Sequence, residues 1–370
     1  MKLCIAYPNE GNYSETFIYN HLKYLDPALT LTGGWRPYKT KEGDSIIKTP
    51  LAEPLRVGIK RVLPRLYPAF YTRALTTYLN AQKPDVLLAE YGLTGCAVMD
   101  ACQQAGVPLV VHFHGFDASF KPTLEEYAEP YKKLFAAAKA LVSVSGDMTD
   151  SLVRLGADPA KVHRNPYGVE TERFTGAEPA RADKIVLAVG RFAGKKAPHL
   201  TIRAFDKALE THPDAQLVMI GSGELLESCQ KLVDELQLRH AVRFAGVLSA
   251  DEIAAWHRKA RLFVQHSVVN PENGDSEGTP NTVLEAASAG LPVVSTRHAG
   301  IKEAVDHEET GFLVEEGDVD GMAAYIVKLL GDPALAQKLG QQGRAKMERE
   351  YEMQTRIAGL RNILEESARI

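Results

Sequence analysis

The sequence predicts an α/β protein with two domains, each a doubly wound parallel sheet covered by helices on both faces. The first observation is length, because 370 residues correspond to about two domains at roughly 150 residues each. The second is that short apolar runs alternate with helix-like runs along the whole chain. The third is that the apolar runs are continuous, which is typical of parallel strands buried on both sides.

The first domain is expected over residues 1–176. Continuous apolar runs predict strands at residues 3–7, 85–89, 108–113 and 141–145. Apolar residues at helical spacing predict helices at 15–25, 95–105 and 148–155.

The second domain is expected over residues 183–350, after a boundary at 175–183 that is rich in Ala, Pro and charge. Its predicted strands are residues 184–189, 216–220, 242–245, 262–265, 292–295 and 311–314. A helix is predicted at 321–330, and the tail after Pro333 is helical with no strand left to pair. Residues 351–370 are expected to form a helix that packs back on the first domain.

Composition argues against several classes of protein. Lys and Arg number 43 against 47 Asp and Glu, and a net charge of −4 argues against a duplex DNA binder. Four cysteines without a CxxC pair indicate neither a disulfide framework nor a cysteine zinc site. The first residues do not read as a signal peptide, and no apolar run reaches the roughly 18 residues of a membrane span, so a cytoplasmic protein is expected.

The loops after the strands hold the candidate site, because ligands of open α/β sheets bind beyond the carboxyl ends of the strands. Gly190 follows the first strand of the second domain, and Arg191 and Lys196 lie in the same loop. Arg offers a planar fork of donors and Lys a point charge, a pairing suited to a diphosphate. The alternative is a solvated basic loop, and Lys195 is the better candidate for a merely solvated side chain.

The next strand leads into Gly221-Ser222-Gly223 and then a helix. A Gly-x-Gly turn between strand and helix lets the backbone approach a phosphate or a ribose closely. It is not the dinucleotide fingerprint, because Leu226 stands where the third glycine would be. The alternative is a tight turn and nothing more.

The strongest pattern runs from Glu277 to Glu285. Thr279 is expected to cap a helix and Pro280 to be its first residue, so that the backbone N–H groups of residues 278–282 form an anion site. Glu285 follows in the second turn among apolar neighbours, and a carboxylate there needs partners such as ribose hydroxyls. The alternative is an exposed Glu on an amphipathic helix.

Glu-x7-Glu, preceded by a Gly-Arg…Lys loop and a Gly-x-Gly turn, resembles family four of the retaining glycosyltransferases. In the first half, GNYSETFI at 11–18 and HFHGFDAS at 112–119 resemble the branch of that family that builds polysaccharides and lipopolysaccharides. The resemblance covers nearly the whole chain and implies the GT-B fold, in which two Rossmann-like domains face each other across a cleft. It also implies retention at the anomeric carbon, with no enzyme nucleophile and no metal.

The resemblance assigns roles on the donor side. Arg191 and Lys196 match the pair that neutralises the donor diphosphate. Glu277 matches the residue that touches the donor sugar, and Glu285 the residue that binds the ribose hydroxyls. The other donor-side positions are Gly11, Gly190, Gly221, Gly223, Gly278, Thr279, Pro280, Asn281 and Thr282.

In the first domain, His114 matches the histidine near the transferred sugar. His112 is a rival, because it lies two residues away on the same strand face. Asp117 either orients His114 or caps the next turn, and Gly115 indicates a sharp exit from the strand.

Two features depart from the family's pattern. Ala197 stands where many members have glycine, and the stretch before Glu277, residues 266–278, is longer than the shortest versions. Asp318-Val319-Asp320 looks like the Asp-x-Asp metal site of another glycosyltransferase fold. Here it opens a predicted helix, so Asp318 is expected to be an N-cap and no metal ligand is predicted.

Residues 55–75 hold basic side chains interleaved with aromatic ones and no acid. Such a segment can lie on an anionic membrane surface or meet the diphosphate of a lipid-linked acceptor. The alternative is a packed helix with a solvated basic face, and Pro64 and Pro68 are expected to break it. The candidate acceptor or membrane residues are Arg56, Lys60, Arg61 and Arg65.

The resemblance therefore implies a hexosyltransferase that takes a sugar from a nucleoside-diphosphate sugar and gives it to a glycan or lipid-linked acceptor. UDP is expected ahead of GDP, with no separate cofactor, no nucleic-acid partner and contact with the cytoplasmic face of the inner membrane as a further option. Two alternatives stay open: a sugar-nucleotide 2-epimerase of the same fold and a non-catalytic sugar-nucleotide-binding partner protein. A nicotinamide dehydrogenase is disfavoured, because the dinucleotide fingerprint fails.

Overall fold

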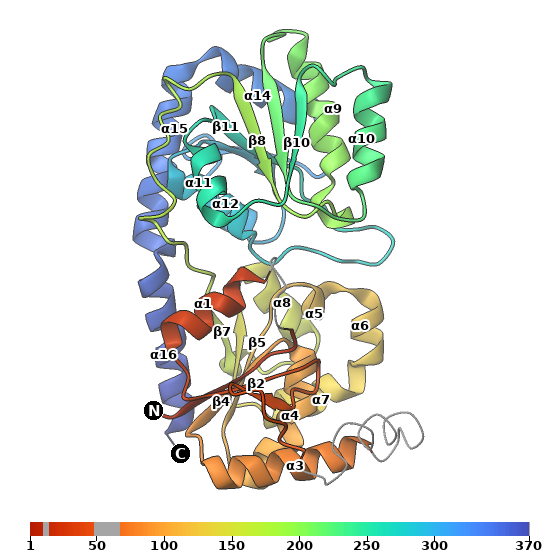
Figure 1. Ribbon diagram of the computed structural model, residues 1–370, viewed down its shortest axis with the longest axis vertical. Coiled ribbons are helices and arrows are strands. Elements are labelled where there is room, and N and C mark those ends of the chain that lie inside the picture. Colours follow the sequence, from red (N-terminus) through yellow and green to blue (C-terminus); the bar gives the residue numbers. More distant parts are fainter. Residues whose placement is uncertain (10–14, 48–66, 370) are drawn as a thin grey trace. The chain divides into compact units, whose positions relative to one another are not determined.

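The computed structural model of the chain describes residues 1–9, 15–47 and 67–369. It divides into two compact units, the first formed by Met1–Asn165 with Ile357–Ile370 and the second by Pro166–Arg356. Each unit contains one sheet between helices (Figure 1). The predicted class, two doubly wound α/β sheets, is confirmed.

The sheet of the first unit has the strand order β3-β2-β1-β4-β5-β6-β7. Every neighbouring pair is parallel except β2 with β3. The strands are β1 (Leu3–Ala6), β2 (Leu29–Thr32), β3 (Lys39–Thr40), β4 (Val86–Glu90), β5 (Leu109–His112), β6 (Ala140–Ser143) and β7 (Val162–Arg164). The outer strands β2 and β3 were not predicted, because they are short and lack a continuous apolar run. A strand was expected to end near residues 168–169, and β7 ends earlier, at Arg164.

Helices connect these strands on both faces of the sheet. They are α1 (Thr16–Leu25), α3 (Tyr67–Gln82), α4 (Gly92–Ala105), α5 (Phe116–Ser119), α6 (Lys121–Glu126), α7 (Ala128–Ala137) and α8 (Gly146–Arg154). Helix α3 packs on α4, and its Tyr67 and Tyr71 are buried in the core. Pro68 lies in the first described turn of α3, where its missing N–H is not needed, and the part of the segment before Tyr67, with Pro64, lies outside the described residues.

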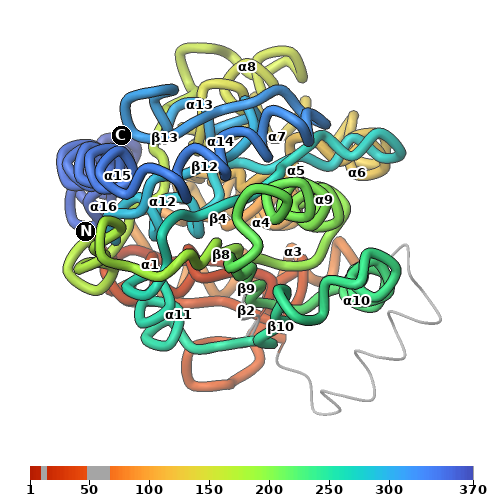
Figure 2. Tube along the Cα trace, turned by 90° about the horizontal axis from the view of Figure 1, so that it is seen from above, coloured from red at the N-terminus to blue at the C-terminus, as the bar shows by residue number. Residues whose placement is uncertain are grey.

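The sheet of the second unit has the order β10-β9-β8-β11-β12-β13 and is parallel throughout. Figure 2 shows β8, β9 and β10 one after another in this order. The strands are β8 (Ile185–Val189), β9 (Gln216–Ile220), β10 (Val242–Gly246), β11 (Leu262–Gln265), β12 (Val293–Thr296) and β13 (Gly311–Val314). All six match predicted strands to within a residue at each end.

Apolar side chains of this sheet pack with α9, α10 and α14 in one core, while α11 and α12 contact β8 and β11. The helices are α9 (Pro198–Leu209), α10 (Leu226–Glu235), α11 (Ala250–His257), α12 (Asn281–Ala289), α13 (Ile301–Ala304), α14 (Val319–Gly331), α15 (Pro333–Lys346) and α16 (Met353–Ala368). Asp318 is the N-cap of α14, as predicted, since its carboxylate accepts the Gly321 N–H at 2.8 Å. Among the described helices, none has the length and hydropathy needed to span a bilayer.

The units divide earlier than the sequence suggested, at Asn165 rather than residue 176. The segment after Pro166 is packed on the second unit, where Arg344 of α15 donates hydrogen bonds to the carbonyls of Thr171 and Phe174. The chain rejoins the first unit at Ile357, within α16, and Arg361 there donates to the Tyr24 carbonyl at 3.2 Å. These long-range contacts have no signature in local composition.

In both sheets the strand order reverses at the first strand of the unit, so that later strands are added on its other side. In the second unit the reversal falls between β8 and β11, and in the first unit between β1 and β4. Loops diverge there beyond the carboxyl ends of the strands and leave room for a ligand. Of the residues singled out from the sequence, the donor-side ones that are described follow β8, β9 and β11, and His112 and His114 lie at the end of β5 and just beyond it.

Candidate functional site

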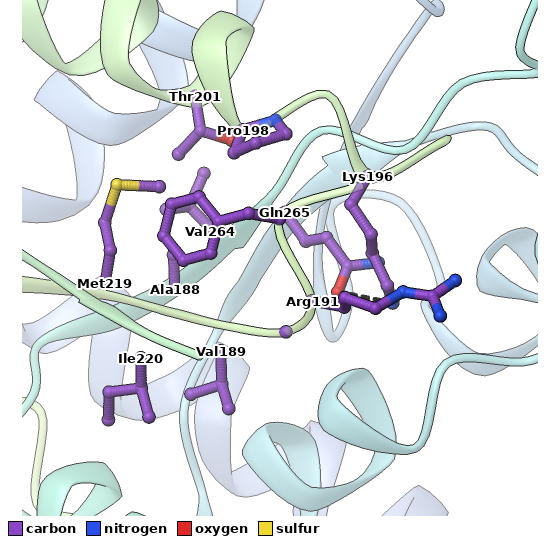
Figure 3. A pocket seen from close by; sticks show the side chains of 12 residues that line it. Ala188, Val189, Arg191, Lys196, Pro198, Thr201, Met219, Ile220, Val264 and Gln265 are labelled. Carbon is purple, nitrogen blue, oxygen red and sulfur yellow. Dashed lines mark hydrogen bonds between the residues drawn. The ribbon is translucent and has the colours of Figure 1, made fainter. Parts of the chain in front are cut away.

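The loop after β8 brings the predicted cations together. Lys196 points toward Gln265 at the end of β11, with its Nζ 3.4 Å from Gln265 Oε1, and Arg191 lies beside it (Figure 3). Arg191 is exposed, and no described carboxylate pairs with it. Burial lowers the pKa of Lys196, an effect that the Glu277 carboxylate opposes.

Glu277 lies against these cations. Its Oε2 is 3.4 Å from Lys196 Nζ and its Oε1 is 4.0 Å from Lys195 Nζ. Burial by itself would raise the pKa of Glu277, but Lys196 and Lys195 outweigh it and hold the pKa below its ordinary value. Glu277 is therefore an ionised carboxylate beside Lys196, one of the cations that are candidates to bind a diphosphate.

Lys195 is not merely solvated, contrary to the sequence-based expectation. Its side chain is 14% exposed, and its Nζ is 3.2 Å from both the Asp275 carboxylate and the Ser276 carbonyl. The partners come from the long loop before Glu277, whose path cannot be read from spacing. Lys195 thus ties the loop after β8 to the loop that carries Glu277.

Gly221 and Gly223 are required by the contact between two loops. A Cβ on Gly221 would lie 2.1 Å from the Gly190 carbonyl oxygen, and one on Gly223 would lie 2.5 Å from that of Phe192. Phe192 also donates its N–H to the Ser222 carbonyl at 3.0 Å. The Gly-x-Gly turn therefore holds the backbone of the cation loop in place.

The helix with the Glu-x7-Glu pattern begins one residue later than predicted. Pro280 occupies the N-cap position, and α12 starts at Asn281. Thr279 is buried against Gly300, where an added Cβ would lie 2.1 Å from the threonine hydroxyl. Thr282 donates its hydroxyl hydrogen to Gln265 Oε1 at 3.0 Å, and Gly278 accepts from the Gly300 N–H.

Glu285 is partly buried on α12 and accepts no hydrogen bond from any other described residue. Burial raises its pKa from an ordinary 4.5 to about 7, although Arg173 opposes the shift. The alternative reading, an exposed Glu on an amphipathic helix, is therefore wrong. A carboxylate in this state is suited to accept hydrogen bonds from a ligand.

A pocket opens beside these residues, between the ends of β8, β9 and β11 (Figure 3). Its lining combines apolar side chains with the cation loop. The lining residues are Ala188, Val189, Gly190, Arg191, Phe192, Lys196, Pro198, Thr201, Met219, Ile220, Val264 and Gln265.

His298 anchors the long loop, and sequence reasoning missed it. Its Nε2 accepts the Glu277 backbone N–H at 3.2 Å, and its Nδ1 lies 2.6 Å from Glu316 Oε1. The other Glu316 oxygen accepts the Val269 N–H at 2.8 Å. One carboxylate thus holds both ends of the loop, and the loop's extra length was the only signal for such an anchor.

Ala197 adopts a left-handed conformation, with φ of 35°, at the start of α9. L-residues with a Cβ are strained in this region, which glycine occupies freely. The departure from the family's glycine is therefore accommodated with backbone strain.

In the first unit, His114 lies just beyond β5 with its ring held by Glu90. His114 Nε2 is 2.8 Å from Glu90 Oε2, and the imidazole side chain is 1% exposed. Asp117 accepts the N–H groups of Gly92, His114 and Gly115 at 2.9–3.0 Å. Asp117 therefore fixes the backbone at His114 rather than its ring.

His112 is buried at the end of β5, and its ring centroid lies 4.4 Å from that of His114. Burial lowers the pKa of His112 well below its ordinary value, which keeps the ring neutral. Gly115 has φ of 146°, and the chain turns sharply into α5 as expected.

Several predicted residues lie outside the described part of the chain. They are Gly11, Arg56, Lys60, Arg61 and Arg65.

Metal-ligating side chains come together at one place in the described residues: His21, Glu90 and His112. Asp320, the second member of the Asp-x-Asp pair, instead forms an ion pair with Lys207 at 2.9 Å. The ion pair of Asp320 and the N-cap position of Asp318 fit the helix start that was expected for residues 318–320.

Two family descriptions match the chain, one in each unit. Residues 32–168 match the glycosyl transferase 4-like domain, and residues 170–346 match the glycosyl transferases group 1. The two matches meet near the division between the units.

Curated relatives give the same assignment. The chain is 29% identical to the amylovoran biosynthesis glycosyltransferase AmsK of Erwinia amylovora, over 77% of this chain and 70% of the relative. It is 31% identical to the D-inositol 3-phosphate glycosyltransferase of Acidothermus cellulolyticus, over 79% and 70%. It is also 31% identical to a GDP-mannose-dependent phosphatidylinositol monomannoside mannosyltransferase of Mycolicibacterium smegmatis, over 55% and 56%.

Among solved structures, HepE of Anabaena, in complex with UDP, has the same fold, with a TM-score of 0.78 and 16% identity over 99% of this chain and 100% of that one. The class defined by fold and site is therefore a GT-B glycosyltransferase. The chain belongs to family four of these enzymes.

Proposed function

We propose that this glycosyltransferase moves a sugar from a nucleoside-diphosphate sugar, UDP ahead of GDP, to a glycan or lipid-linked acceptor in polysaccharide or glycolipid biosynthesis, with retention. The observation that carries the proposal is that Arg191 lies beside Lys196 (Figure 3) and Lys196 pairs with Glu277, while Glu285 on the following helix accepts no hydrogen bond from any other described residue. Cations for a diphosphate and a carboxylate for a ribose meet at the switch point of one sheet.

The chemistry follows from charge. When the bond between sugar and diphosphate breaks, negative charge grows on the leaving phosphate. Arg191 and Lys196 stabilise this charge, because both already lie in place before the reaction. Lys196 then shares its charge between the phosphate and Glu277, which stands where the resemblance puts the contact with the sugar.

His114 is proposed to contact the transferred sugar from the first unit. The resemblance supports this role. Its ring is 1% exposed, so a sugar that reaches it has to displace neighbouring atoms.

The donor assignment is tested by a thermal-shift screen with UDP, GDP, ADP, CDP and NAD, each with and without EDTA. A ligand that binds the folded state raises its melting temperature. The expected result is a shift with one nucleoside diphosphate that EDTA leaves unchanged and that Glu285→Ala abolishes. Asp214→Ala is the matched control, because this exposed carboxylate pairs with Lys184 at the amino ends of β8 and β9, away from the candidate site. A shift with NAD alone would contradict the site.

An acceptor assay separates the enzyme classes. A transferase gives a glycosylated acceptor. A 2-epimerase gives an altered free sugar without acceptor. A non-catalytic binding partner converts neither the sugar nucleotide nor the acceptor. The anomeric configuration of the product, read by NMR, decides between retention and inversion.

Membrane contact by residues 55–66 belongs to the same proposal, and their basic side chains support it. Changing Arg61 and Arg65 to Gln together is expected to reduce sedimentation with vesicles that contain anionic lipid. The control changes Arg181 and Arg349, which are exposed in the second unit. Equal sedimentation of the two double variants would leave the segment without a membrane role.

A further inference from the structure

Lys195 carries a largely buried charge that the proposed function does not use. Its side chain is 14% exposed, and the cations among the described residues that line the pocket in Figure 3 are Arg191 and Lys196. Removing an ammonium group from water costs free energy unless other groups compensate. The groups around Lys195 therefore indicate what its charge does.

Three groups of the loop before α12 surround the Lys195 ammonium. Its Nζ lies 3.2 Å from Asp275 Oδ1, 3.2 Å from the Ser276 carbonyl oxygen and 4.0 Å from Glu277 Oε1. The backbone is held as well, because the Lys195 carbonyl accepts the Val268 N–H at 2.9 Å. The first two contacts fix the ammonium, and the third leaves its charge facing Glu277.

The two carboxylate oxygens of Glu277 differ in their surroundings. Oε2 lies 3.4 Å from Lys196 Nζ, whereas Oε1 is buried and accepts no hydrogen bond from any other described residue. Lys195 is the cation that faces Oε1. Of the described ion-pair partners of this carboxylate, which is 11% exposed, Lys196 alone would remain without Lys195.

Donor binding is expected to make the charge of Lys195 matter. Lys196 lines the pocket, so its charge is divided between the diphosphate and Glu277 when the donor binds. An incoming anion also disfavours the ionised form of a nearby carboxyl group. Lys195, held by Asp275 and Ser276, keeps its charge beside Glu277 in this state.

We propose that Lys195 is a positioning residue for the transfer reaction, which keeps Glu277 ionised while Lys196 binds the donor diphosphate, so that Glu277 can accept a hydrogen bond from the donor sugar. The inference rests on the proposed function, because it needs Glu277 to contact that sugar. Lys195 itself touches no substrate. A protonated Glu277 would present a hydroxyl donor in place of an acceptor.

Other titratable groups face Glu277 from the elements around it. His298, just beyond β12, accepts the Glu277 N–H at 3.2 Å, and Glu316, just beyond β13, lies 2.6 Å from the same imidazole. Burial by itself would raise the pKa of Glu277, and Lys196 and Lys195 outweigh it. The imidazole and Glu316 are unchanged in the variants below, so a difference between the variants reports the lysine.

The alternative is that Lys195 merely ties two loops together through its ion pair with Asp275. Both roles predict that activity falls when the lysine is removed, but they differ in their dependence on pH. A lost tether lowers kcat equally at every pH. A lost positive charge raises the pKa of Glu277, so it lowers kcat most at low pH, where the carboxylate takes up a proton.

The test variant is Lys195→Met, which removes the charge but keeps an unbranched side chain and the backbone hydrogen bond to Val268. Asp275→Asn is the matched control, because it also breaks the ion pair between Lys195 and Asp275 but leaves the charge of Lys195 with Glu277. Lys195→Arg keeps the charge and is expected to retain the pH dependence of the wild type. Melting temperatures show that the variants are folded.

The direct readout is the pKa of Glu277, measured by NMR on the full chain labelled with ¹³Cδ-glutamate, without ligand and with saturating UDP. The signal is assigned by its loss in Glu277→Gln. Lys195→Met is expected to raise this pKa, because an opposite charge within about 4–6 Å favours the ionised form. Asp275→Asn is expected to leave it unchanged or lower it. The same pKa of Glu277 in wild type and Lys195→Met would overturn the proposal.

Kinetics with saturating donor complete the test. Relative to wild type, kcat of Lys195→Met is expected to be about 10-fold lower at about pH 5.5 and within about 3-fold at about pH 8, because kcat reports ionisation in the enzyme–substrate complex. The nucleoside-diphosphate thermal shift is expected to stay unchanged.

Equal losses of kcat in Lys195→Met and Asp275→Asn at every pH would overturn the proposal and leave Lys195 a tether between loops. If the wild type transfers no sugar, the proposed function fails. The titration of Glu277 then decides by itself whether Lys195 keeps this carboxylate ionised.

Discussion

Arg191 and Lys196 are five residues apart in sequence, yet they differ in environment. Lys196 is paired with Glu277, whereas Arg191 is exposed and has no described carboxylate partner. At the residue scale, Arg191 can thus be removed without depriving a described buried carboxylate of its partner.

Arg191→Ala is therefore expected to separate activity from stability. Turnover should fall by about 10²-fold, because charge on the leaving phosphate loses a donor. The free energy of unfolding should change by less than about 0.5 kcal/mol, as for other surface substitutions. Steady-state transfer and denaturant unfolding measure the two quantities. Lys184→Ala, at the opposite edge of the sheet, is the control, and equal rates for both variants would remove Arg191 from the diphosphate site.

Glu285 makes stability depend on pH in a defined window. Its folded pKa, about 7, lies above the ordinary 4.5, so between these values the folded state binds more protons than the unfolded state. Stability contributed by protonated Glu285 is present below pH 4.5 and is lost as the pH rises to about 7. Glu285→Gln should therefore gain melting temperature relative to wild type between pH 5 and pH 8. A constant difference across this range would mean that Glu285 is ionised throughout.

At the scale of elements, contacts from two directions hold the long loop before α12. Lys195 binds it from the loop after β8, and His298 with Glu316 binds it from the ends of β12 and β13. Because His298 Nε2 accepts the Glu277 N–H, the ring has to be neutral with its proton on Nδ1. The position of Glu277 is thus set by Lys195, His298 and Glu316 together.

His298→Ala is expected to lower kcat by about 10-fold or more while nucleoside-diphosphate binding persists, because Glu285 and the Gly-x-Gly turn are untouched. His307→Ala is the matched control: this imidazole also accepts a backbone N–H, from Leu313 at 3.0 Å, but contacts no part of the Glu277 loop. Similar losses of kcat in both variants would indicate general destabilisation instead of a role in positioning Glu277.

At the scale of the whole molecule, one arginine secures the segment that leads into the second unit. Arg344 Nη1 donates to the carbonyls of Thr171, Phe174 and Ser288. Arg344→Ala should expose these carbonyls and cost about 1–3 kcal/mol. Hydrogen exchange of residues 170–177 should rise, whereas Arg349→Ala, which removes a surface ion pair with Glu350, should leave it unchanged. Unaltered exchange in Arg344→Ala would mean that the other contacts suffice.

The sequence predicted the central strands and the donor-side cluster because these depend on local patterns. Buried parallel strands read as continuous apolar runs, and the cation loop, the Gly-x-Gly turn and Glu-x7-Glu each follow a strand end or open a helix. It failed at the outer strands β2 and β3 and placed the start of α12 one residue early. The packing of Thr279 on Gly300, 21 residues later, is not visible in local spacing.

By itself, then, the sequence determined the α/β class, the two sheets and the candidate residues that follow their strands, since strand periodicity and short spacings fix them. Tertiary structure alone decided which side chains meet: Glu90 with His21 across 69 residues, Glu277 with His298 across 21, and Lys195 with Asp275 across 80. Each of these contacts joins elements that are far apart in the sequence and meet only in the folded chain. Their meeting sets the place of Glu277 and gives the buried Glu90 carboxylate its partner His21.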